Sequence, residues 1–212
     1  MNFNEVGLKI LDMAFPIFLI FLSIGFSISA PGFLGWDNIF GMMHAMAPIA
    51  IISTGMALIV IMGKLDISLG SIALVSMAVS SVLLQSGYSV GSAIIVTLLV
   101  GLLLGAVNGF VICFLQVNPL IATLGTMIAF RGLGNQITDA QVVLLPDSLR
   151  MFGNFALGPI FFDSILFLVI LALINILHQN TAFGKVVMAI GNDELTARRV
   201  GLPVTRTVFL SF

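Results

Sequence analysis

The sequence predicts an all-α fold, a polytopic bundle of transmembrane helices. Of its 212 residues, 59% are hydrophobic and only 8% are charged, whereas soluble domains carry about 25% charged residues. Uncharged runs recur along the chain, and several are long enough to cross a bilayer core, for which about 20 residues suffice. We therefore expect residues 1–212 to form a single transmembrane domain with about six spans.

Six apolar segments are the expected spans. The first covers residues 13–36, and because it is longer than the apolar part of a signal peptide, we favour a retained helix over cleavage near Ala30. The others are expected at 38–63, 67–84, 91–115, 119–137 and 160–177, divided by turn-forming residues. A last apolar run, 207–212, is too short to cross, so we expect the domain to be incomplete at its C-terminus.

A polar segment at residues 178–206 orients the bundle. It holds four of the chain's eight basic residues, namely Lys185, Arg198, Arg199 and Arg206. Basic residues favour the cytoplasmic side of a membrane. Counting spans from a cytoplasmic N-terminus places this segment in the cytoplasm together with Lys9 and Lys64, so we predict that orientation.

Within this segment, residues 192–203 predict a short capped helix. Asn192 or Asp193 suits the N-cap, Glu194 and Arg198 are four residues apart in the favourable order, and a glycine followed by a proline ends the helix. The alternative is a solvated helix with no special role, because charged helical runs are usually solvated.

Glycines recur at four-residue spacing in the fourth expected span, at Gly101, Gly105 and Gly109. Small residues at this spacing let two helix backbones approach closely. We therefore expect this face of the span to pack against another helix.

A polar motif at residues 63–71 (GKLDISLGS) precedes the third expected span. Gly63 and Gly70 permit a break in the backbone or a close contact, while Asp66 and Ser68 suit the cap of the following helix. Two interpretations stay open: a helix cap at the membrane surface, or a direct contact with a transported solute.

The sequence contains no recognisable catalytic motif. A phosphate-binding glycine loop, a serine nucleophile motif and a zinc-protease motif are all absent from it, so we expect no enzyme activity, no cofactor and no metal site. The single Cys113 allows no disulfide within the chain. Asp66 is the only acid between residues 38 and 130, and His44 is interpreted as an interfacial histidine rather than a proton relay, so a proton-coupled carrier is disfavoured.

Five motifs, in family order and spread over nearly the whole chain, resemble those of the ribose-type permease family of ABC transporters. They are residues 54–56 (TGM), 63–71, 104–109 (LGAVNG), 118–132 (NPLIATLGTM with a following Arg-Gly) and 183–201 (FGK, AIGNDE, Ala-Arg and a glycine). Two departures stand out. Lys64 occupies a position where a second glycine is common, and the final spans of the family are absent from this sequence.

The resemblance implies a transport subunit of the bacterial cytoplasmic membrane that moves a monosaccharide or related solute. Its partners would be separate ATPase subunits, a second permease subunit, identical or different, and an extracytoplasmic solute-binding protein; nothing indicates a nucleic-acid partner. The short helix would dock on the ATPase, and the residues carried over for this coupling are Gly191, Asn192, Glu194, Ala197, Arg198 and Gly201. The alternative is a stand-alone secondary carrier or channel.

Overall fold

The computed structural model describes residues 3–141, 149, 151 and 153–212, with side chains from residue 13 onward. Six longer helices form most of this part: α1 (Phe3–Ser29), α2 (Trp36–Ile61), α3 (Leu69–Gln85), α4 (Val90–Cys113), α5 (Pro119–Ile137) and α7 (Phe162–Asn180). Three short helices follow: α8 (Ala182–Asn192), α9 (Glu194–Arg199) and α10 (Val204–Ser211). One antiparallel hairpin of β1 (Ala156–Leu157) and β2 (Ile160–Phe161) precedes α7.

Each of the six predicted spans contains one helix, which confirms the all-α prediction. By length and composition, α2, α4 and α7 are able to cross a membrane, and the apolar part of α1 (Met13–Ser29) and α3 are shorter apolar helices. Helix α5 is less apolar, because Arg131, Asn135 and Gln136 lie in its second half. The number of crossings therefore stays a prediction.

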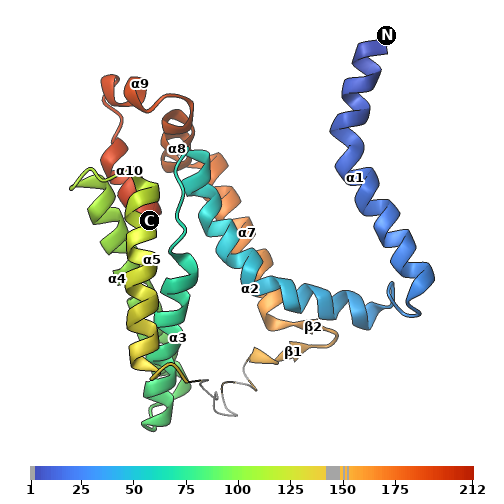
Figure 1. Ribbon diagram of the computed structural model, residues 1–212, viewed down its shortest axis with the longest axis horizontal. Helices are drawn as coiled ribbons and strands as arrows, with labels where there is room; N and C mark the ends of the chain where they lie inside the picture. The colour runs from blue at the N-terminus through green and yellow to red at the C-terminus, as the bar shows by residue number, and fades with distance from the viewer. Residues whose placement is uncertain (1–2, 142–148, 150, 152) are drawn as a thin grey trace.

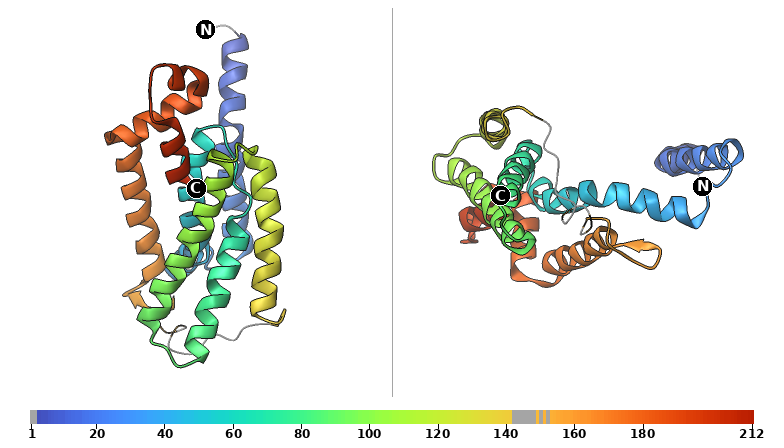
Figure 2. Two further views of the ribbon diagram at one scale, coloured as in Figure 1. Left: turned by 90° about the vertical axis from the view of Figure 1, so that its left-hand side faces the viewer. Right: turned by 90° about the horizontal axis from the view of Figure 1, so that it is seen from below.

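The helices form a bundle from which α1 stands apart (Figures 1 and 2). Helices α3, α4 and α5 pack together around Val75, Leu104 and Phe130, and α7 lies along α2. Helix α2 changes direction part-way along its length. Pro48 lies inside it and has no amide hydrogen to donate, which is a common cause of such a bend.

The chain alternates between two ends of the bundle (Figure 1). The N-terminus, the α2–α3 and α4–α5 connections and the α8–α9 segment lie at one end, and the α3–α4 connection and the hairpin lie toward the other. The predicted polar segment 178–206 therefore lies at the same end as the N-terminus, with Lys64 beside it.

A core of buried apolar side chains supports the end that carries α8, α9 and α10. It joins the end of α2 to α4, α5 and the three short helices, and its members are Met62, Ile112, Ala122, Val186, Val187, Ile190, Ala197, Val204 and Val208. By contrast, long apolar side chains on the outward face of α4 are more than half exposed: Leu98, Leu99, Leu102 and Leu103. Such a surface suits lipid, because acyl chains are as apolar as leucine.

Candidate coupling helix and helix break

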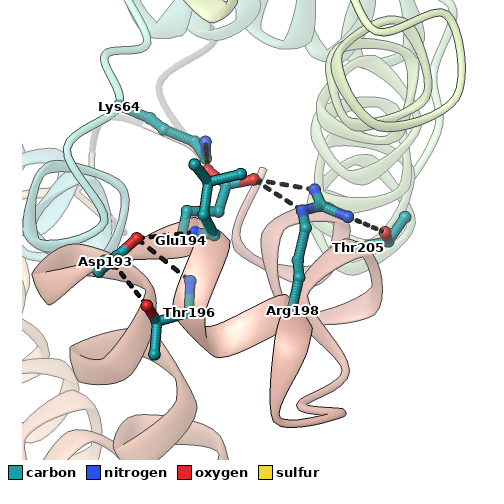
Figure 3. Close-up of polar contacts among 7 residues, drawn as sticks. Lys64, Asp193, Glu194, Thr196, Arg198 and Thr205 are labelled. Carbon is teal, nitrogen blue, oxygen red and sulfur yellow. Dashed lines mark hydrogen bonds and ion pairs between the residues drawn. The ribbon is translucent and has the colours of Figure 1, made fainter.

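The short helix α9 begins at a well-formed cap. Asp193 is the N-cap, and its Oδ1 accepts hydrogen bonds from the amides of Leu195 at 2.9 Å and Thr196 at 3.2 Å (Figure 3). The Thr196 hydroxyl donates to the other carboxylate oxygen at 2.6 Å. These hydrogen bonds, that from the Thr196 side chain foremost, lower the pKa of Asp193 below its ordinary value. Of the two predicted caps, Asp193 is the cap of α9, and Asn192 is the last residue of α8.

The end of α9 is closed by a Schellman motif. The amide of Gly201 donates to the carbonyl of Arg198 and the amide of Leu202 donates to that of Ala197, both at 3.1 Å. This geometry needs a left-handed residue, and Gly201 has φ +80°. A helix of only six residues is thus defined at both ends by its own sequence.

Glu194 lies at the centre of an ion-pair network. Its Oε2 accepts from Lys64 Nζ at 2.7 Å, and its Oε1 accepts from Arg198 Nη2 at 2.8 Å and Nε at 3.2 Å (Figure 3). Arg198 also donates to the Thr205 hydroxyl at 3.3 Å, which ties α9 to α10. Burial opposes ionisation of Glu194, but the hydrogen bonds from Lys64 and Arg198 outweigh it and hold its pKa below the ordinary value.

Helix α8 packs against the end of α2, and α9 packs on α8. Ala197 is buried in the same core as Met62 and Ile190. Gly191 faces the Ile61 carbonyl so closely that a Cβ there would overlap the oxygen. Helices α8 and α9 and the end of α2 therefore form one packed unit.

The six residues predicted for coupling have different environments. Gly191 and Gly201 shape the backbone of the segment, Glu194 is half-buried and Ala197 is buried. The side chains of Asn192 and Arg198 are exposed. The side chains that α9 presents outward were not among those predicted: Leu195 and Val200 are 67% and 68% exposed, and Arg199 is exposed beside them. The apolar side chains of Leu195 and Val200 in an otherwise polar stretch were the feature from which this surface could have been predicted.

The motif at 63–71 forms a break between α2 and α3. Gly63 has φ +70° and ends α2, and residues 64–67 are not helical. Ser68 is the N-cap of α3, but its side chain makes no capping hydrogen bond; instead Asp66 Oδ1 accepts from the Ser68 amide at 2.8 Å and the Ser68 hydroxyl at 2.7 Å and so orders the turn that leads into α3. Gly70 is exposed, and a Cβ there would meet no neighbouring atom within 4 Å.

A buried chain of polar side chains joins this break to α4. The Asn108 amide donates to the Ser68 hydroxyl at 2.7 Å, and that hydroxyl donates to Asp66. Asp66, Ser68 and Asn108 are 2%, 0% and 0% exposed. Among the described residues, Asp66 Oδ2 and Asn108 Oδ1 have no hydrogen-bond partner. Asn108 lies in the 104–109 motif that carries the family resemblance, but sequence reasoning gave it no role of its own.

The glycine face of α4 lies mainly against α10. A Cβ on Gly105 would overlap the backbone of Phe212, and one on Gly109 would lie 3.0 Å from the Phe209 ring. Gly101 is more open, with the Ser76 hydroxyl 3.7 Å from the same position.

The structure also contains a polar pair near the hairpin and a cavity with polar residues near α9. His44 Nδ1 lies 2.7 Å from Asp163 Oδ2, and its ring stacks on Phe161 at the hairpin, at the end of the bundle away from α9. A cavity of about 390 Å³ near α9 is lined by Lys64, Cys113 and Glu194, among other residues.

The described residues include no cluster of three or more His, Cys, Asp or Glu side chains suited to a metal ion.

Apolar helices of membrane-spanning length, together with a polar capped segment packed at one end, define the chain as a multi-pass membrane protein. Residues 38–212 match the family described as branched-chain amino acid transport system / permease component, and the chain belongs to that family. This confirms the permease resemblance and a place in the bacterial cytoplasmic membrane.

Curated relatives are 27–34% identical to this chain over the aligned residues. The fructose import permease protein of Bifidobacterium longum is 32% identical over 197 residues, covering 91% of this chain and 55% of that protein. The L-arabinose ABC transporter permease protein of Azospirillum brasilense is 34% identical over 193 residues, covering 87% and 56%. The ribose import permease protein of Haemophilus influenzae is 27% identical over 211 residues, covering 95% and 64%. The chain thus spans 55–64% of the length of these relatives. No solved structure matches it.

Proposed function

We propose that this chain is the membrane-spanning subunit of an ATP-driven ABC importer for a monosaccharide or related solute. The family description names branched-chain amino acids, but the relatives above are named for fructose, L-arabinose and ribose. Those names favour a sugar. The sequence has no phosphate-binding glycine loop, so ATP hydrolysis is assigned to a separate subunit and the chain to no enzyme class of its own.

The proposed topology has six crossings within one transmembrane domain over residues 1–212, with the N-terminus in the cytoplasm. Support comes from the alternation of the chain between the two ends of the bundle. Lys64 and the basic segment 178–206 lie at one end, as the preference of basic residues for the cytoplasm requires. The hairpin and the His44–Asp163 pair then lie on the outer side.

The observation that carries the proposal is the construction of α9. This helix is capped at both ends, and Glu194 and Ala197 attach its inner face to the bundle. Its outer surface presents Leu195, Arg199 and Val200. A short rigid helix with exposed apolar groups suits docking to an ATPase, because force from the partner passes through a body that does not deform.

The other proposed partners are a second permease subunit and an extracytoplasmic solute-binding protein. Two permeases around one path would cover apolar surface that the single chain exposes. Helix α1, which lies apart from the rest of the bundle, carries the clearest example of such a surface. The binding protein would meet the outer end of the bundle. The proposal needs no cofactor, metal or nucleic acid.

Co-purification of the full-length gene product with its candidate ATPase tests the proposal. The native protein is expected to retain the ATPase, and replacement of residues 192–201 by a flexible linker is expected to abolish retention. A finer test is Leu195→Asp, matched by Leu157→Asp in β1, because both leucines are more than half exposed but lie toward opposite ends. Only Leu195→Asp is expected to lose the ATPase.

Two outcomes contradict the proposal in different ways. If both aspartate variants retain the ATPase, the outer face of α9 is not the docking surface. If no ATPase binds the native protein and the purified chain carries solute down a gradient alone, the protein is a stand-alone carrier or channel.

A further inference from the structure

An ion pair joins the coupling helix to the connection between α2 and α3. Lys64 Nζ lies 2.7 Å from Glu194 Oε2, although the two residues are 130 positions apart in the sequence (Figure 3). The side chains are 13% and 33% exposed. A pair held this far from water is screened less by salt than a fully exposed pair.

The lysine is held in place by its backbone. Helix α2 ends in a Schellman motif in which the Gly63 amide donates to the Val60 carbonyl at 2.9 Å and the Lys64 amide donates to the Ile59 carbonyl at 3.1 Å. Lys64 is therefore the last residue whose position is set by α2. Two residues later, Asp66 accepts hydrogen bonds from the amide and the hydroxyl of Ser68, the N-cap of α3.

The glutamate is equally well positioned on the other side. Glu194 follows the N-cap of α9, and Arg198, one turn later, holds its second oxygen. Arg198 continues to Thr205 of α10. The carboxylate therefore moves with α9 as a unit, and Lys64 is the described side chain that connects this unit to the helix break.

The buried side chains of Asp66, Ser68 and Asn108 continue the connection from Lys64 to α4. A displacement of Lys64 passes along residues 64–66 to Asp66, then through the Ser68 hydroxyl to Asn108 in α4. Residues 65–67 are not helical, and the Leu65 carbonyl accepts a long hydrogen bond from the Thr123 hydroxyl of α5 at 3.5 Å.

We infer that Lys64 is a positioning residue for coupling, which holds α9 to the α2–α3 break so that movement of the docking helix shifts the start of α3. This inference rests on the proposed function. It assigns to the pair a task beyond stability: without it, an ATPase still binds and hydrolyses ATP, but the movement reaches α3 less completely.

The matched variants are Lys64→Arg and Lys64→Met in the full-length protein, reconstituted with its ATPase, a second permease subunit and binding protein. Arginine keeps the charge, and methionine keeps an apolar stem of similar length without it. The measurement is solute imported per ATP hydrolysed, with co-purification of the ATPase recorded for each variant. We expect Lys64→Arg to keep the native ratio and Lys64→Met to lose import while ATP hydrolysis continues.

A reversible cross-link separates coupling from folding. Lys64→Cys and Glu194→Cys are combined with Cys113→Ala, because Cys113 lines the same cavity. A short bifunctional methanethiosulfonate joins the two introduced thiols, and reduction releases them within a single preparation. We expect the cross-linked protein to import solute at a higher ratio to ATP hydrolysis than the same protein after reduction.

The results that overturn the inference are specific. Equal ratios in Lys64→Arg and Lys64→Met, or no change on reduction of the cross-link, show that the pair does not transmit movement. Loss of the ATPase in Lys64→Met alone assigns the lysine to docking instead. Failure of the native protein to bind any ATPase overturns the proposed function itself, and the inference with it.

Discussion

The turn that leads into α3 allows a sharp contrast between two substitutions of Asp66. Asp66→Ala removes the acceptor of the Ser68 amide and the Ser68 hydroxyl. A lost hydrogen bond to the Ser68 amide costs about 1 kcal/mol, and a buried hydroxyl left without its acceptor costs about 1 to 3 kcal/mol. The sum is about 2 to 4 kcal/mol, which corresponds to a fall in the unfolding midpoint of roughly 5 to 15 °C for a domain of this size.

Asp66→Asn keeps this arrangement. The amide oxygen can accept both hydrogen bonds from Ser68, and the new nitrogen replaces Oδ2, which accepts none among the described residues. The substitution also removes a buried charge that has no ion-pair partner in the described part of the chain. We therefore expect Asp66→Asn to stay within about 1 kcal/mol of the native protein.

The assay is thermal unfolding of the purified full-length protein in detergent, followed by a thiol-reactive fluorophore at the half-buried Cys113. Asp37→Ala is the control, because this exposed aspartate also lies near the start of a helix; its effect should stay within about 0.5 kcal/mol. If Asp66→Asn is as unstable as Asp66→Ala, the carboxylate charge matters more than the two hydrogen bonds from Ser68, and these hydrogen bonds are not what stabilises the helix break.

Three other predictions concern packing and ionisation. Gly191→Ala is expected to destabilise by about 1 to 3 kcal/mol, because its Cβ would overlap a carbonyl at the end of α2; Gly55→Ala, where the same Cβ meets no atom within 4 Å, should have little effect on the unfolding midpoint. Gly105→Leu should lower the yield of folded protein by pushing α10 from α4, whereas altered selectivity at normal yield would place this face on the solute path. The lowered pKa of Glu194 means that its ion pairs add stability above its ordinary value of 4.5 and lose that contribution as pH falls through the folded-state pKa; the difference in midpoint between native protein and Glu194→Gln should persist at neutral pH and vanish only on acidification below 4.5.

The local features of residues 192–203 were predictable from the sequence. Caps, turns and pairs four residues apart depend on neighbours along the chain, so the Glu194–Arg198 pair and the glycine ending of α9 followed from the pattern alone. The choice between Asn192 and Asp193 as cap did not. That choice required knowing where α8 ends, and α8 is positioned by packing of its buried face on the bundle.

The sequence by itself determined that this is a membrane protein built from helices, where those helices lie, and to which family it belongs. Only the tertiary structure decided that Lys64 meets Glu194 and that Ser68 meets Asn108. The physical reason is that lipid tails and helix interfaces are equally apolar, so the hydrophobic pattern of a span does not show which face meets another helix. Contacts between distant residues follow from the way the helices pack, and a linear pattern does not contain that arrangement.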